Sequence, residues 1–168
     1  MPHPETETTL AQIRKQAGRR RSIVFVSGNF NIVHPGHLRL LKFAAECGDF
    51  LVVGVNVHTG QDWMLPPELR LEGVRAIGVV DHALLLHDRP EDFVAELKPA
   101  VVVTVGDRHE TLATAIAASY QHIPLCHVQG GEVTGSIDDK VRNAVTQLAD
   151  IHCVATEAAF ERLLKRIM

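Results

Sequence analysis

Short apolar runs alternate with amphipathic stretches along most of the chain. Six runs rich in Val, Ile, Leu and Phe predict strands: Ile23–Val26, Phe50–Val55, Ala83–Leu86, Ala100–Val105, Ile123–Val128 and Ile151–Val154. Helical spacing predicts a helix after each strand: His37–Cys47, Leu69–Val79, Pro90–Leu97, Glu110–Gln121, Asp138–Leu148 and Glu157–Ile167. This alternation indicates repeated βαβ units.

The predicted strands are apolar throughout and do not alternate with polar residues. That pattern is typical of strands buried on both faces, and hence of a parallel sheet covered by helices. We therefore expect an α/β fold: a single doubly wound, Rossmann-like parallel sheet of five to six strands with helices on both faces. Residues 1–21 are interpreted as a tail, with a candidate short helix over Leu10–Ala17, and residues 22–168 as one domain. In such sheets, ligands bind beyond the carboxyl ends of the strands.

Composition narrows the possible partners. The 168 residues are 46% hydrophobic and 22% charged, which fits one globular domain, and the net charge of −3 argues against nucleic acid as a partner. No apolar run is long enough to span a membrane, and the polar start Met1–Thr9 is unlike a secretion signal. We therefore expect no membrane association and a cytoplasmic setting, with the three cysteines reduced.

The first strand leads into a turn that contains Gly28 and then into two histidines, His34 and His37, at the start of a helix. A helix N-terminus presents N–H groups and a positive dipole end, which suit a phosphate. Gly28 allows a ligand to approach the backbone, and imidazoles three residues apart lie on one side of the first turn. The two histidines are thus candidates for stabilising charge on a phosphate, and the structural alternative is one capping and one packing histidine.

Residues 22–108 resemble the HxGH nucleotidyltransferases. The matching segments are Gly28–Asn31, His34–His37, Gly48–Asn56, Pro67–Arg70, Val80–Asp81 and Lys98–Val101. The resemblance implies transfer of CMP or AMP from CTP or ATP to a phosphorylated sugar or polyol, in cell-surface sugar biosynthesis. It also implies a homodimer, and Mg²⁺ that enters with the nucleotide and is not held by a metal site of the protein.

The same resemblance implies the site residues. His34, His37 and Arg70 would be catalytic, and the nucleotide would contact the following residues: Gly28, Asn29, Phe30, Asn31 and Gly36. Two features depart from the family pattern. Asn31 stands where the family has an aspartate, and the loop Val57–Trp63 has no Lys or Arg where the family has a basic loop. Activity is therefore a weaker expectation than fold.

Residues 98–168 resemble part of a different family, the hydrolysing UDP-N-acetylglucosamine 2-epimerases. The matching segments are Pro99–Arg108, His127–Asp139, Arg142–Ala144 and Ala155–Glu157. The resemblance implies proton removal at C2 of the sugar and departure of UDP, with Asp107 and Asp138 as the matching carboxylates. Gln129 replaces a family glutamate and cannot exchange a proton. The structural alternative is that Asp107 caps a strand end and Asp138 caps a helix.

The two resemblances meet in one sheet at Ala100–Arg108. Asp107, Thr134 and Ser136 would then lie near the nucleotide, the last two offering hydroxyl groups to a phosphate ahead of the predicted helix. Three functions remain open. The first is a cytidylyl- or adenylyltransferase, which the length favours. The others are a fragment of a hydrolysing 2-epimerase and a nucleotide-binding domain with impaired catalysis.

Overall fold

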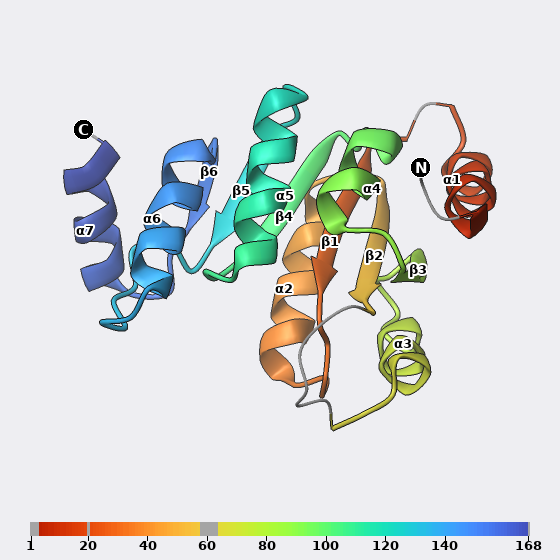
Figure 1. Cartoon of the computed structure of the whole chain (residues 1–168), viewed down its shortest axis with the longest axis horizontal. Coiled ribbons are helices and arrows are strands. Elements are labelled where there is room, and N and C mark those ends of the chain that lie inside the picture. The colour runs from red at the N-terminus through yellow and green to blue at the C-terminus, as the bar shows by residue number, and fades with distance from the viewer. Residues whose placement is uncertain (1–3, 20, 58–63, 168) are drawn as a thin grey trace.

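Six parallel strands form one sheet in the order β3–β2–β1–β4–β5–β6 (Figure 1). The strands are β1 (Ile23–Gly28), β2 (Phe50–Asn56), β3 (His82–Leu86), β4 (Val101–Val105), β5 (Leu125–Val128) and β6 (Ile151–Cys153). The computed structural model describes residues 4–19, 21–57 and 64–167. The loop noted above for its lack of basic residues lies, apart from Val57, outside the described residues.

Helices precede and follow the strands along the chain. They are α1 (Pro4–Ala17), α2 (Pro35–Glu46), α3 (Pro67–Arg75), α4 (Pro90–Leu97), α5 (His109–Tyr120), α6 (Asp138–Leu148) and α7 (Glu157–Ile167). The predicted doubly wound, Rossmann-like fold is confirmed. Among the described residues, no helix is both long and apolar enough to cross a bilayer.

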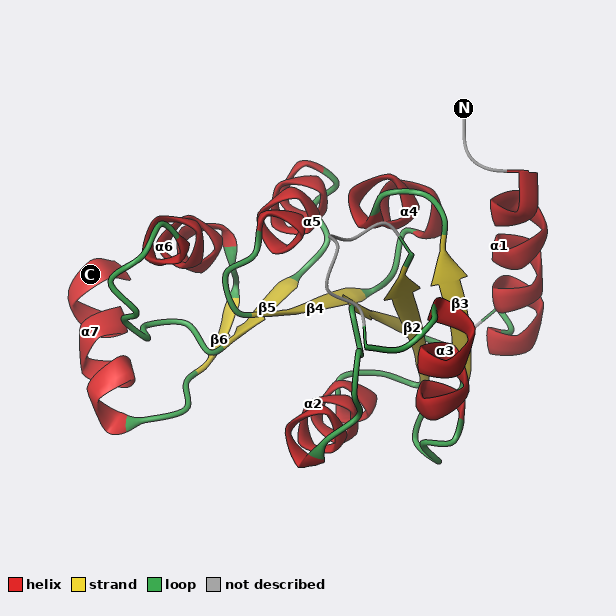
Figure 2. Cartoon of the chain, turned by 60° about the horizontal axis from the view of Figure 1, so that its bottom comes forward, coloured by secondary structure: helices red, strands yellow, loops and turns green. Residues whose placement is uncertain are grey.

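Two apolar cores lie on opposite faces of the sheet, because successive side chains of a strand point to opposite sides. On β1, Phe25 packs into the core beneath α1, α4, α5 and α6, whereas Val24 and Val26 pack into the core formed with α2 and α3. Figure 2 shows α4, α5 and α6 on one side of the sheet and α2 and α3 on the other. Burial on both faces explains why the strands are apolar throughout.

The interpretation of residues 1–21 as a tail requires correction. Pro4–Ala17 forms α1, whose Leu10, Ile13 and Ala17 are buried in the core on the α4 side. Arg14 extends this contact by donating a hydrogen bond to the backbone oxygen of Glu96 (2.7 Å). The sequence hid this packing because the helix carries only a narrow apolar stripe among polar residues.

The strand order places a topological switch point between β1 and β4. From β1 the chain continues to β2 and β3 on one side, and from β4 it continues to β5 and β6 on the other. At such a point the loops leave in opposite directions and open a crevice at the carboxyl ends of the strands. The residues that follow β1 and β4 are therefore the natural place for a site.

Candidate functional site

The two histidines after β1 cap the start of α2. His34 is the N-cap residue and its Nδ1 accepts a hydrogen bond from the Gly36 N–H (3.1 Å). His37 Nδ1 accepts in turn from the His34 N–H (3.4 Å). Because an Nδ1 that accepts carries no proton, each neutral imidazole has its proton on Nε2. The pair thus forms a capping box, and the His37 ring also hydrogen-bonds to the backbone of Ile32.

The environment of His37 favours its neutral form. Burial lowers the pKa of His37, and the neighbouring His34 lowers it further. The ring centroids of these two histidines are 4.0 Å apart, and the ring of Phe30 lies 5.1 Å from that of His37. Glycine at position 36 leaves room for the capping position of the His34 ring, because a Cβ there would lie 2.8 Å from that ring and displace it. The spacing of this motif therefore has a structural reason of its own.

Arg70 and Asn31 hold the backbone around the ends of β1 and β2. Arg70 is 1% exposed and donates hydrogen bonds to the backbone oxygens of Asn29 (2.6 Å) and Asn56 (3.0 Å). The Asn31 Oδ1 accepts from the backbone N–H groups of Met64 and Leu65 (3.1 and 3.3 Å). Arg70 therefore joins two strand ends, and the catalytic role predicted for it has no support from these contacts.

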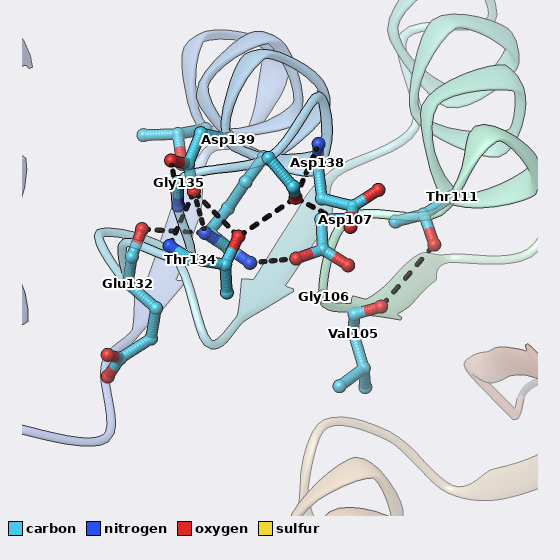
Figure 3. A network of polar contacts seen from close by, with 12 residues as sticks. Val105, Gly106, Asp107, Thr111, Glu132, Thr134, Gly135, Asp138 and Asp139 are labelled. Carbon is cyan, nitrogen blue, oxygen red and sulfur yellow. Dashed lines mark hydrogen bonds and ion pairs between the residues drawn. The ribbon is translucent and has the colours of Figure 1, made fainter.

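An arginine and two aspartates form a cluster beyond the end of β4 (Figure 3). Arg142 on α6 forms an ion pair with Asp107, 35 residues earlier, and another with Asp139 (2.7 Å). Its Nη1 also donates to the backbone oxygen of Glu132 (2.7 Å). The Arg142 side chain is 4% exposed, so the guanidinium holds these groups from within the protein.

Asp139 orders the loop that precedes α6. Its carboxylate accepts hydrogen bonds from the backbone N–H groups of Thr134 and Gly135 (both 2.8 Å) and from the Thr134 hydroxyl (3.0 Å). The backbone hydrogen bond from Thr134 is the main reason that the pKa of Asp139 lies below its ordinary value. The Ser136 hydroxyl donates to Asp138 (2.9 Å). These hydroxyl groups have carboxylate partners, and their role toward phosphate stays a prediction.

Asp107 and Asp138 have different surroundings. Asp107 is held by Arg142, whereas the Asp138 carboxylate accepts a hydrogen bond from the Ser136 hydroxyl and forms no ion pair with another described residue. The capping alternative for Asp138 does not describe its position, because α6 begins at this residue and Ile137 precedes it as the N-cap. Asp138 therefore offers a carboxylate in the first turn of α6, one residue before Asp139, which pairs with Arg142.

The backbone around the cluster is fixed by His127 and by the two glycines that follow Gln129. His127 is fully buried, and its Nε2 lies 2.8 Å from the backbone oxygen of Gly106, the residue before Asp107. Burial lowers the pKa of His127 and thus favours the neutral ring. Gly131 has a φ of +78°, and a Cβ there would lie 2.3 Å from the Ala159 backbone oxygen on α7. The glycine pair thus allows the loop to pack against α7.

Two neighbouring cavities extend from this edge of the sheet. One of about 170 Å³ lies at the switch point between β1 and β4; its lining includes Gly28, Asn29, Phe30 and His37. Another of about 700 Å³ includes His34, Gly36 and His37 together with Gln129 in its lining. The structure thus places the histidine pair beside the loop of the second motif. Arg70, Asn31, Thr134 and Ser136 do not line either cavity.

Sequence analysis missed three members of the cluster as site residues: Glu132, Asp139 and Arg142. The sequence spacing could have identified two of them, because Asp139 and Arg142 are three residues apart in a predicted helix and can form an i, i+3 ion pair, which the structure shows. Among the described residues, no group of three or more His, Cys, Asp or Glu is arranged to hold a metal ion.

Comparison with known proteins connects the second half of the chain to one family. A family model described as UDP-N-acetylglucosamine 2-epimerase matches residues 67–167. A Legionella pneumophila UDP-N,N'-diacetylbacillosamine 2-epimerase (hydrolyzing) is 49% identical over 67 residues, which are 40% of this chain and 18% of that protein. A bifunctional protein HldE of Nitratiruptor is 30% identical over 135 residues, or 74% of this chain and 29% of that protein.

The fold has counterparts among solved structures. A UDP-GlcNAc 2-epimerase from Neisseria meningitidis, bound to UDP-GlcNAc, aligns with 87% of this chain and 43% of its own length, at 20% identity and a TM-score of 0.60. At this identity the likeness shows the fold alone. The chain spans about a fifth of the Legionella relative and less than half of this solved structure.

These comparisons correct the predicted enzyme class. The part of the sequence resemblance that concerns 2-epimerases is confirmed by the match over residues 67–167. The prediction of a cytidylyl- or adenylyltransferase is wrong, because the family model and the Legionella relative are 2-epimerases. The HxGH motif, on which that prediction rested, has a structural role in this chain, because His34 and His37 cap the start of α2.

Proposed function

The chain belongs to the UDP-N-acetylglucosamine 2-epimerase family, and on this basis we propose that it binds a UDP-activated 2-acetamido sugar and takes part in its hydrolysing 2-epimerisation. The observation that carries the proposal is the cluster of Asp107, Asp139 and Arg142 at the carboxyl edge of the sheet, with Asp138 directly before Asp139 in the first turn of α6. The strand order places this edge where doubly wound sheets bind their ligands.

The reaction needs groups that accept and return a proton. A base removes the proton at C2 of the sugar while the bond from C1 to UDP breaks and UDP leaves with its electron pair. Water then adds to C1, and C2 receives a proton on the opposite face, which inverts that carbon. Carboxylates placed within hydrogen-bond reach of C2 are suited to these proton transfers.

The surroundings of each carboxylate suggest a division of roles. Arg142 holds Asp107 in place and compensates its charge, so Asp107 is suited to orienting the sugar next to the strand end. Among the described residues, Asp138 pairs with a hydroxyl group and with no cation, so it is the better candidate for exchanging a proton. Gln129 cannot exchange one, and this function therefore falls to the aspartates.

The neighbouring cavity of about 700 Å³ is a candidate site for part of the nucleotide sugar, because its volume lies in the range of pockets that bind small ligands. The imidazoles of His34 and His37 line its wall, and we propose that His34 offers its Nε2–H as a hydrogen-bond donor there. A diphosphate bound there would accept a hydrogen bond from His34. The sequence-based expectations of Mg²⁺ and of a homodimer remain predictions.

A turnover assay tests the proposal. The purified chain is incubated with UDP-N-acetylglucosamine, and the release of UDP is followed with a coupled enzyme assay. We expect UDP release that falls at least 100-fold in Asp138→Asn and in Asp107→Asn. Asp92→Asn is the matched control, since this exposed aspartate lies on α4 and pairs with Arg89. Equal UDP release by all three variants and the parent chain would exclude the proposed site.

A further inference from the structure

Two buried oxygen atoms near the switch point between β1 and β4 have no hydrogen-bond partner in the described part of the chain. One is Oδ1 of Asn56, the last residue of β2, and the other is Oε1 of Glu110, in the first turn of α5. Asn56 is 7% exposed, and its Nδ2 already donates to Asn29 Oδ1 (3.1 Å). A buried polar atom without a partner costs about 1–3 kcal/mol, so the arrangement calls for a ligand or water.

Both residues lie between two cavities and line each of them: one of about 170 Å³ that opens between the ends of β1 and β4, and one of about 280 Å³ next to α4. The first has the hydroxyl groups and the aromatic ring that suit a ligand. It lies on the α5 side of the β4 end, whereas the Asp107–Arg142 cluster lies on the α6 side; Thr111 and Val105 mark the α5 side in Figure 3. Pockets for whole drug-sized ligands measure about 300–1,000 Å³. This cavity is therefore suited to one ring of a larger ligand.

The lining is rich in hydrogen-bond acceptors. The hydroxyl groups of Thr104, Thr111 and Thr114 all donate to backbone oxygens (3.4, 3.3 and 2.8 Å), which leaves their lone pairs free to accept. Together with Asn56 and Glu110, they call for a ligand that brings several donors. Phe30, Leu40 and Val105 complete the cavity with apolar surface.

The charge of the cavity also restricts the ligand. The second carboxylate oxygen of Glu110 lies 3.3 Å from Arg108 Nε and 3.2 Å from His109 Nδ1, so part of its charge is already compensated. A cationic ligand would meet the guanidinium of Arg108, which lines the same cavity. Neutral donors such as hydroxyl groups fit this environment better than an ammonium group does.

We propose that this cavity binds a single sugar ring, whose hydroxyl groups donate hydrogen bonds to Asn56 Oδ1 and Glu110 Oε1 while its C–H face lies against Phe30. The inference rests on the proposed function in taking the ring from a nucleotide sugar. Either ring of that ligand, the ribose or the 2-acetamido pyranose, has the required chemistry. The cavity would thus fix one end of the substrate and present the rest to the carboxylate cluster.

Calorimetric titration of the Glu110→Gln variant with UDP and with UDP-N-acetylglucosamine tests the inference. The substitution keeps the shape of the side chain and places an NH₂ group, or an uncharged oxygen, toward the cavity. Loss of a hydrogen bond to a charged group is expected to weaken binding roughly 10- to 100-fold. Weaker binding of both ligands would place the ribose in the cavity, and weaker binding of UDP-N-acetylglucosamine alone would place the pyranose there.

Glu72→Gln is the matched control, because Glu72 is an exposed glutamate on α3 outside the cavity. If Glu110→Gln binds both ligands within twofold of the control, the inference is overturned and the cavity is filled by water. That result would leave the proposed function intact if UDP release still depends on Asp138. Conversely, loss of affinity in Glu110→Gln without any UDP release by the parent chain would uphold the sugar cavity and refute the proposed reaction.

Discussion

Replacement of Arg142 by methionine removes the group that joins β4, α6 and the loop between β5 and α6. The guanidinium is 4% exposed and contacts Asp107, Asp139 and the Glu132 backbone oxygen. Methionine fills a similar volume and offers no hydrogen-bond donor. In Arg142→Met the two carboxylates would therefore face each other without the cation that compensates them.

The size of the effect follows from this burial. Removing one partner of a buried ion pair costs about 3–5 kcal/mol, because the remaining charge stays in a poorly solvated place. The side chains of Asp107 and Asp139 are 23% and 24% exposed, so water compensates part of that charge. We therefore expect the free energy of unfolding to fall by about 2–4 kcal/mol.

Urea unfolding followed by circular dichroism measures this change. Arg142→Lys serves as the control variant, since it keeps the positive charge but loses the fork that contacts several acceptors at once. We expect Arg142→Lys to lose less stability than Arg142→Met. If Arg142→Met lowers the free energy of unfolding by less than about 1 kcal/mol, the cluster does not hold these elements together and the reasoning fails.

Three further predictions concern stability. Ile13→Ala should cost about 2–4 kcal/mol in urea unfolding because Ile13 is fully buried, whereas Gln12→Ala on the exposed side of α1 should change stability by no more than about 0.5 kcal/mol. Folding lowers the pKa of Asp139, so its charged form stabilises the fold above pH 3.8, and this stabilisation is lost as the pH falls through the folded-state pKa. When urea unfolding is repeated at pH values from 3.8 downward, the free energy of unfolding of Asp139→Asn should therefore fall less steeply than that of the parent chain. The pKa of His127 is lowered from 6.5 by folding, so below pH 6.5 the unfolded chain binds more protons than the folded chain and the free energy of unfolding should decline. This decline should be shallower in His127→Gln, and an equal dependence of stability on pH in both chains would contradict the prediction.

Much of the fold could be predicted from the sequence, because strands that are buried on both faces of a sheet consist of continuous apolar runs. Pro90–Leu97, Asp138–Leu148 and Glu157–Ile167 were predicted with the bounds that the helices have in the structure. The start of β3 was placed one residue late, since His82 is polar but already pairs with Val52. A short helix over Leu10–Ala17 was compatible with the sequence, but its earlier start at Pro4 and its packing were missed because that packing depends on the distant helix α4.

The site could be predicted only in part. Asp107 was found because a carboxylate directly after an apolar strand is a local signal, but its partner Arg142 lies 35 residues further along and needed the structure. The histidine pair was assigned to nucleotidyl transfer although the same spacing also satisfies the first turn of a helix. Asn56 and Glu110 could not be predicted as site residues, because they stand out only through two side-chain oxygen atoms that are buried without a hydrogen-bond partner in the folded chain.

Proton exchange at C2 of the sugar tests the central claim most directly. UDP-N-acetylglucosamine is incubated with the chain in D₂O, and the C2 proton is followed by NMR. The proposed function predicts that 2-acetamido sugar released by the parent chain carries deuterium at C2, and that Asp138→Asn abolishes this incorporation. Released sugar that keeps its C2 proton, or a substrate that stays unchanged in the presence of the parent chain, would contradict the account.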